Sequence, residues 1–185
     1  MRKIVSGLFI SLDGVIEAPH EWHFPYFNDE MGAAVTDQMQ KSDTMLLGRV
    51  TYEEFAGYWP NQSEDEVEMA GYMNNTPKLV VSNSLTPADI TWQNTTLITG
   101  NVAEQLAAIK EQPGKDISIT GSATLVRSLI RDGLLDELQL LLHPVVVGRG
   151  KRLFIDDGMK APLKLINERT HDNGVLHLTY APDRR

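Results

Sequence analysis

Short apolar runs alternate with helix-like segments along most of this sequence, and the alternation restricts the fold more than any other feature. The first run, at 4–10, has the length and composition of a buried strand. Further runs follow at 44–47, 78–82, 95–99 and 116–120. Strands that alternate with helices pair in parallel, because each helix returns the chain to the same end of the sheet.

The segments between these runs have helical character, at 29–40, 51–58, 64–73, 102–110 and 123–131. The last is the clearest, because Leu125, Leu129 and Ile130 recur at helical spacing. Asn101 is a suitable N-cap for the helix that follows it. The acidic segment at 64–73 is expected to be an exposed helix.

The end of the chain changes character. A long strand is expected at 137–147, bent near Pro144, and two extended segments follow at 163–170 and 175–180. Asn173-Gly174 lies between these two, and Asn-Gly between strands is a strong signal for a β-hairpin. The sequence therefore predicts a single α/β domain, with a mixed, mostly parallel sheet flanked by helices and a C-terminal antiparallel hairpin.

The composition excludes several classes of protein. The chain carries a net charge of −8, whereas nucleic-acid binding and attachment to anionic membranes both need clustered cations. The longest apolar stretch, at 138–147, is interrupted by Gln139, His143 and Pro144 and is too short to span a bilayer. The chain has no cysteine, which fits a reducing cytoplasm. We therefore expect a cytoplasmic protein that binds neither nucleic acid nor membranes.

Three strand-to-turn junctions could bind a ligand that carries phosphate. At the first, Gly48 and Arg49 follow the strand at 44–47 and precede a helix, whose N-terminus attracts anions. The alternative is an ordinary helix start, with Thr51 as N-cap and Glu54 completing a capping box. The spacing alone leaves both interpretations open.

The other two junctions are weaker signals. After the strand at 116–120, Gly121 would let a ligand approach the backbone closely, but a tight packing turn explains it equally well. After the strand at 78–82, Ser82 and Asn83 place hydroxyl and amide groups where open α/β sheets bind ligands. Ordinary loop polarity would give the same residues.

Metal and nucleophile signals are weak. His20-Glu21-Trp22-His23 lacks the spacing of a zinc-binding His-Glu-x-x-His motif, so these side chains are expected to line a loop and no metal is expected. The sequence contains no Gly-x-Ser-x-Gly nucleophile elbow. Neither metal catalysis nor a serine nucleophile is therefore indicated.

The order and spacing of several motifs resemble the dihydrofolate reductase superfamily. The matching segments lie at 11–16, 46–53, 78–82, 120–125, 134–138 and 143–150. The last three are similar to the branch named for the C-terminal reductase domain of the riboflavin-biosynthesis deaminase/reductase. The resemblance extends over 4–180, and it implies the same kind of fold as the pattern of strands and helices.

The resemblance also implies that NADPH binds across the carboxyl ends of the strands. Gly48, Arg49 and Thr51 would hold phosphate groups, including the 2′-phosphate. Ser82 and Asn83 would line the adenosine end. Ile16 would lie beside the nicotinamide, and the pyrophosphate would rest on a helix N-terminus formed by Thr120, Gly121, Ser122, Ala123, Thr124 and Leu125.

The substrate side departs from true dihydrofolate reductases. In those enzymes a Trp is followed three residues later by Pro and then, two further on, by the acid that binds the pterin. Here Trp22 and Pro25 match, but Phe27 occupies the place of the acid. Asp29 and Glu30 are offset from that place and, on a helix, would point elsewhere. Folate reduction is therefore not expected.

The resemblance implies an NADPH-dependent reductase that transfers hydride to a small polar heterocycle or a related carbonyl or imine. The alternative is a non-catalytic nucleotide-binding protein that retains the fold. Asp13 is the candidate catalytic residue because it follows the first strand at the ligand end, although an Asp-Gly turn explains it equally well. Trp22, Phe27 and Trp59 would form an apolar wall for the substrate or belong to the core. The apolar stretch at 138–147 and the edge hairpin favour a homodimer.

Overall fold

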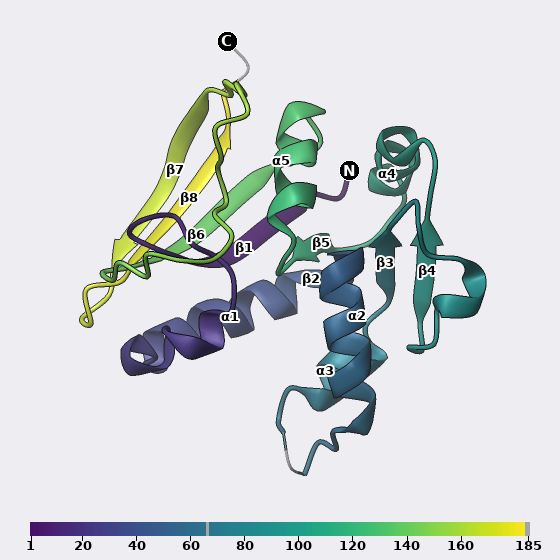
Figure 1. Ribbon diagram of the computed structural model, residues 1–185, viewed down its shortest axis with the longest axis horizontal. Coiled ribbons are helices and arrows are strands. Elements are labelled where there is room, and N and C mark those ends of the chain that lie inside the picture. Colours follow the sequence, from purple (N-terminus) through teal and green to yellow (C-terminus); the bar gives the residue numbers. More distant parts are fainter. Residues whose placement is uncertain (66, 184–185) are drawn as a thin grey trace.

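The alternating pattern produces one eight-stranded sheet with the strand order β4-β3-β2-β5-β1-β6-β8-β7. Figure 1 shows the sheet from β7 at the left to β4 at the right in this computed structural model, which describes residues 1–65 and 67–183. The strands are β1 (Ile4–Ser11), β2 (Ser42–Gly48), β3 (Lys78–Val81), β4 (Thr95–Ile98), β5 (Asp116–Ile119), β6 (Glu137–His143), β7 (Leu163–Thr170) and β8 (Leu176–Pro182).

Strand pairing is parallel through most of the sheet and antiparallel at one edge. The central strand β1 pairs in parallel with β5 on one side and β6 on the other. By contrast, β8 is antiparallel to both β6 and β7. The predicted α/β class, with a mostly parallel sheet and a C-terminal antiparallel hairpin, is therefore confirmed.

Helices cover both faces of the sheet. Leu46 of β2 belongs to a core cluster with α4 and α5, whereas its neighbours Met45 and Leu47 pack with α2 and α3 on the opposite face. Met31 of α1 packs against Leu141 of β6. The helices are α1 (Asp29–Lys41), α2 (Arg49–Tyr58), α3 (Ala70–Asn75), α4 (Val102–Lys110) and α5 (Ala123–Arg131).

The hairpin between β7 and β8 forms at the predicted Asn-Gly pair. The His171 backbone N–H donates to the Val175 carbonyl at 2.9 Å, which closes a three-residue loop. Gly174 ends that loop at φ 84°, a conformation that glycine adopts without steric cost. The local sequence therefore specifies this turn.

Helix α2 begins earlier than the capping-box interpretation requires. Its N-cap is Gly48, so the chain passes from β2 into the helix without a loop, and Arg49 is already helical. Thr51 therefore lies inside the first turn and does not cap the helix. The capping-box alternative is wrong.

Two other predicted elements differ from those observed. The acidic helix predicted at 64–73 is a turn followed by the short helix α3, while Glu66 lies outside the described residues. Only the later part of that segment supplies side chains for the core, Ala70 and Met73, and closely spaced carboxylates repel one another in a helix. The strand predicted at 137–147 ends at His143, because Pro144 cannot donate to the ladder.

Asn101 occupies the N-cap of α4, as predicted, but its side chain does not cap the helix. Its amide nitrogen instead donates to Glu104 Oε2 at 2.5 Å. Among the described residues, the helices are all too short or too polar to cross a membrane.

Candidate cofactor and substrate site

Two helices begin side by side at the carboxyl ends of neighbouring parallel strands. β2 pairs with β5; β2 leads directly into α2 after Gly48, and β5 leads into α5 through the short turn at 120–122. A Cβ atom added to Gly48 would lie 2.7 Å from the Ser122 Cβ, and one added to Gly121 would lie 3.2 Å from Thr51 Oγ1. The fold therefore brings together the two glycine turns that the sequence singled out.

The two helix starts offer backbone donors to the same region. The N-cap of α2, Gly48, has no side chain to satisfy the first-turn N–H groups. At α5 the Ser122 hydroxyl accepts from the Leu125 N–H at 3.3 Å. Ser122 also has φ 77°, which is unusual for a residue with a side chain and is often found at functional sites. Together the helix dipoles favour an anion here.

Arg49 is next to this anion-favouring region but has a partner of its own. Its Nη1 donates to Glu53 Oε2 at 2.7 Å, one turn along α2. Both side chains are nearly half exposed. Because exposed ion pairs contribute little to stability, a phosphate group could replace the Glu53 carboxylate at small cost.

The third predicted turn lies at the end of β3, beside β2. The Ser82 hydroxyl accepts from the backbone N–H groups of Ser84 and Leu85, each at 3.1 Å. Asn83 Oδ1 accepts from the Gly100 N–H at 3.2 Å. These oxygen atoms hold the turns after β3 and β4, so the two side chains have a clear structural role at the predicted adenosine end.

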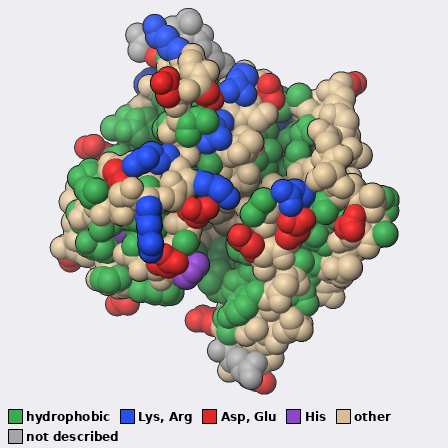
Figure 2. All heavy atoms as spheres, viewed as in Figure 1, with side chains coloured by type: hydrophobic (Ala, Val, Ile, Leu, Met, Phe, Trp, Pro, Cys, Tyr) green, Lys and Arg blue, Asp and Glu red, His purple; other side chains and the backbone are tan. Residues whose placement is uncertain are grey.

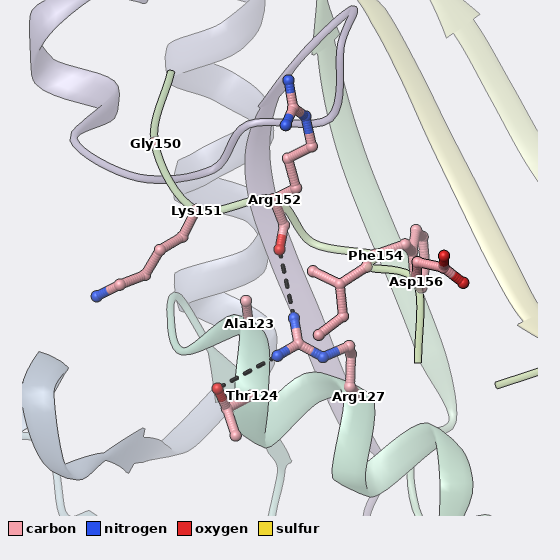
Figure 3. Close-up of a pocket in the computed structure, with 9 residues that line it drawn as sticks. Ala123, Thr124, Arg127, Gly150, Lys151, Arg152, Phe154 and Asp156 are labelled. Atoms are coloured by element: carbon pink, nitrogen blue, oxygen red, sulfur yellow. Dashed lines mark hydrogen bonds between the residues drawn. The ribbon is translucent and has the colours of Figure 1, made fainter. Parts of the chain in front are cut away.

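A cavity of about 560 Å³ lies beside the first turn of α5. Figure 3 shows Arg127 crossing it from α5, with its guanidinium donating to Thr124 Oγ1 and to the Arg152 carbonyl. In the described part of the chain, no carboxylate lies within ion-pair distance of Arg127, whereas Arg131 pairs with Asp157. The cavity is lined by Ala123, Thr124, Arg127, Gly150, Lys151, Arg152, Phe154, Ile155 and Asp156.

Asp13 fixes the loop that follows β6. Its carboxylate accepts from the Ser11 hydroxyl at 2.7 Å and from the backbone N–H groups of Val147 and Gly148 at 3.0 and 2.9 Å. These hydrogen bonds, of which the one from the Ser11 hydroxyl has the largest effect, hold the pKa of Asp13 far below its usual value. Such a carboxylate stays ionised and positions the loop, which argues against its donating a proton.

Ile16 lies in the same region as Asp13. Its backbone N–H donates to the Lys151 carbonyl at 3.0 Å, and its side chain packs against the main core cluster. Together with the pairing of Val15 and Arg152, this bond joins the loop after β1 to the loop that lines the cavity.

Aromatic and histidine side chains gather between β1, β6 and the start of α1. Trp22 contacts the His143 ring edge-on at 5.2 Å, and Phe27 contacts the His23 ring at 5.8 Å. Figure 2 shows a hollow lined by hydrophobic side chains between α1 and α2, with a histidine at its rim. Trp59 packs elsewhere, with Phe55 and the cluster on α2 and α3.

The carboxylates near the start of α1 do not replace the missing pterin acid. Glu30 accepts from Arg169 at 2.6 Å and from the Asp172 N–H at 3.0 Å, so it ties α1 to the β7–β8 hairpin. The Asp172 N–H, and then Arg169, lower the pKa of Glu30. Asp29 is exposed. Neither carboxylate belongs to the aromatic cluster, in which Phe27 contacts His23.

Residues 2–177 match the family described as the RibD C-terminal domain. The chain belongs to the RibD C-terminal domain family. This RibD C-terminal domain is 36% identical over 182 residues to "Uncharacterized protein YyaP" of Bacillus subtilis (strain 168), covering 97% of this chain and 94% of that one.

Solved structures confirm the fold. The RibD C-terminal domain aligns with a putative riboflavin biosynthesis protein from Shewanella sp. PV-4 at a TM-score of 0.78 and 20% identity, covering all of both chains. A dihydrofolate reductase from Enterococcus faecalis complexed with NADP(H) gives 0.63 and 15%, covering 98% of this chain and 96% of that one. At these identities the similarity shows the fold alone.

A longer protein from Thermotoga maritima shares the fold as well. It is described as a diaminohydroxyphosphoribosylaminopyrimidine deaminase/5-amino-6-(5-phosphoribosylamino)uracil reductase. The TM-score is 0.68 at 13% identity, and the alignment covers 98% of this chain but 57% of that one. The fold of this RibD C-terminal domain thus corresponds to a part of that protein.

Sequence reasoning missed the cationic cavity and the histidine pair of this site. Arg127 lies in the helix predicted at 123–131, where no sequence motif marks it as a ligand-binding residue. In the sequence, His23 belongs with His20 to a loop segment that does not fit a metal motif, and His143 only interrupts an apolar stretch. A histidine that ends an apolar strand, as His143 does, was the available signal, because a buried imidazole needs partners.

Proposed function

We propose that this RibD C-terminal domain is an NADPH-dependent reductase that transfers hydride to a small polar heterocycle or a related carbonyl or imine. The observation that carries the proposal is the close approach of the α2 and α5 N-termini, where Gly48 faces Ser122. Two sets of backbone donors and two helix dipoles converge there, a combination that suits a pyrophosphate. A side chain at Gly48 would fill the space.

The surrounding residues fit the rest of the cofactor. Arg49 is within one turn of the pyrophosphate position and would pair with the 2′-phosphate once released from Glu53. Arg127 adds a cation without a carboxylate partner among the described residues, in the cavity beside α5. When bound, NADPH supplies the hydride. The chain orients it and excludes water, with Asp13 holding the loop next to β1.

The substrate side favours a ring without a strong positive charge. Phe27 replaces the carboxylate that a protonated pterin needs, and the nearby Glu30 is already paired. The T. maritima protein that shares the fold is named for a uracil derivative, and this supports a pyrimidine-like substrate here. The aromatic rings of Trp22 and Phe27 would bind such a ring by stacking and edge contacts.

Calorimetry with NADPH and NADH tests the cofactor assignment. A hydrogen bond to a charged group contributes about 1.5–3 kcal/mol. Arg49→Ala should therefore lower the affinity for NADPH by about 10–100-fold. The affinity for NADH should fall much less. The matched control is Glu53→Gln, which frees Arg49 and should leave NADPH binding equal or tighter. Equal affinity for the two cofactors, unchanged in Arg49→Ala, would contradict the proposal.

Turnover separates the reductase from its alternative. NADPH oxidation is measured with 5-amino-6-(5-phosphoribosylamino)uracil and with dihydrofolate as separate probes. Oxidation that depends on the uracil derivative supports the proposed substrate class. Tight NADPH binding without oxidation of either probe would favour a non-catalytic nucleotide-binding protein or a substrate of another class.

A further inference from the structure

His23 is held between aromatic rings at the edge of the aromatic cluster. Its imidazole is stacked on Phe9, with ring centroids 4.6 Å apart and planes 12° apart, and Phe24 lies against it at 4.3 Å. Phe24 and Phe27 are themselves 64% and 48% exposed. His23 is thus a fixed, nearly buried imidazole beneath an exposed aromatic surface, which is where a planar ligand would rest.

The two nitrogens of His23 have different surroundings. Nδ1 is enclosed and has no hydrogen-bond partner among the described residues. Nε2 has no hydrogen-bond partner among the described residues either, but it is not enclosed, so it is the nitrogen that reaches the surface. A proton can therefore enter or leave the ring only at Nε2.

His143 stands behind His23, with its ring centroid 6.2 Å away and its plane nearly perpendicular. Its Nδ1 lies 2.7 Å from the Leu141 carbonyl and must carry the hydrogen, since a carbonyl can only accept. The other nitrogen, Nε2, therefore has a free lone pair, and it is buried without a partner in the described chain. Two buried nitrogens without a partner among the described residues, Nδ1 of His23 and Nε2 of His143, therefore belong to neighbouring rings.

Three acidic side chains around the cluster have cationic partners, and Asp29 is exposed. Glu30 pairs with Arg169, Glu17 with Lys151 and Glu21 with Arg149. The titratable groups packed against the two imidazoles are thus each other and Tyr26, with His20 on the same loop as His23. An imidazole is the group here that can exchange a proton near neutral pH.

We propose that His23 is the catalytic acid of this reductase, and this rests on the proposed function. As hydride from NADPH bonds to the substrate carbon, the π electrons of the C=N or C=O bond move to the heteroatom. That atom takes the proton from Nε2 of the His23 imidazolium, whose N–H electrons stay on the ring. Solvent then returns a proton to Nε2, and His143 acts as the positioning residue that keeps the other hydrogen on Nδ1.

The first test compares His23→Gln with His20→Gln, the same change at an exposed histidine three residues earlier. With NADPH and 5-amino-6-(5-phosphoribosylamino)uracil, His23→Gln should lower kcat by about 10²–10⁴-fold and change KM little. NADPH affinity should stay the same in both variants, which shows that the fold is intact. A kcat of His23→Gln within about twofold of the His20→Gln value would overturn the proposal.

The pH profile separates an acid from a structural ring. Burial, followed by the charges of His143 and His20, holds the pKa of His23 below its usual value. The wild-type kcat/KM should fall as the pH rises through that pKa, because the protonated form is consumed. His23→Gln should lose this step. A profile with the same step in both proteins would assign it to another group and refute the role of His23.

The positioning role of His143 has its own matched pair. His143→Asn keeps a donor for the Leu141 carbonyl but removes Nε2, and it should shift the pH step. His171→Asn is the control, because His171 is also buried with an unpartnered Nδ1 but lies in the β7–β8 hairpin. Equal effects of the two variants on the step would reject the positioning role.

NMR of the imidazole nitrogens shows, independently of turnover, which nitrogen of His23 carries the hydrogen. In the NADPH-bound protein, neutral His23 should carry its hydrogen on Nδ1 and take up its second proton at Nε2. Neutral His23 protonated on Nε2, or a ring that stays neutral down to about pH 4, would overturn the proposal. Because NADPH binding is measured separately, either result would leave the cofactor assignment standing.

Discussion

Gly48→Ala should destabilise the protein by forcing apart the starts of α2 and α5. The backbone at Gly48, φ −81° and ψ 163°, is one that alanine adopts freely, so the substitution adds no backbone strain. The new methyl carbon would lie 2.7 Å from the Ser122 Cβ and 2.8 Å from its Oγ. The first distance is about 0.8 Å inside ordinary carbon–carbon contact, and both atoms belong to a short side chain on a helix N-cap.

The expected magnitude follows from overpacking. Adding atoms to a closely packed position costs about 1–3 kcal/mol. For a chain of this length the midpoint of thermal unfolding falls about 2–4 °C for each kcal/mol. The displacement of the two helix starts should also weaken NADPH binding, because their backbone donors would no longer face one ligand.

Ser122→Gly provides the second arm of a double-mutant cycle. By itself this substitution removes the hydrogen bond that caps the Leu125 N–H, which costs a few tenths of a kcal/mol when glycine replaces serine. It also stabilises the protein, because glycine adopts the positive φ at this position without strain. In the double variant the clashing atoms are gone, so most of the destabilisation by Gly48→Ala should disappear. Urea unfolding measures all four proteins. Additive effects of the two changes would refute the close approach of the two turns.

Three further predictions come from other parts of the molecule. Burial lowers the pKa of Lys78 to about 8, so the unfolded chain binds more protons than the folded one above that pH. In urea titrations, the free energy of unfolding of the wild type minus that of Lys78→Met should therefore rise between about pH 8 and 10. A difference that stays constant over this range would contradict the prediction. With Phe27 at the acid's place, NADPH oxidation with dihydrofolate should be weak or absent, whereas antifolate-sensitive turnover in the common range of about 1–10³ per second would assign the role to another acid. We also propose a homodimer through the edge strand β7, where Leu165 and Ile166 are exposed, and light scattering at 20.7 kDa would refute it.

The reason for expecting a dimer changes with the structure. The sequence predicts that the apolar stretch at 138–147 offers uncovered surface, but β6 lies between β1 and β8 and is paired on both edges. The open edges belong to β4 and β7, and the residues of β7 are mostly exposed. A sequence shows that a strand is apolar, but only the strand order shows whether its edge is occupied.

Local patterns determined the secondary structure and the fold class. The alternation of apolar runs with helical periods and the Asn173-Gly174 turn each act over a few residues. For that reason they can be interpreted without knowing what the rest of the chain does. The exceptions were the capping box at Thr51, the acidic helix and the strand predicted at 137–147, whose bounds the local pattern did not give correctly.

The chemistry of the site was decided by tertiary structure. Gly48 meets Ser122 only because β2 and β5 become neighbours in the sheet, and His23 meets His143 only because the loop after β1 folds over the end of β6. Asp13, a candidate acid by sequence, is committed to the loop at 147–148. The state of a carboxylate or an imidazole depends on partners far away along the chain, and burial and strand order, which no local pattern encodes, supply those partners.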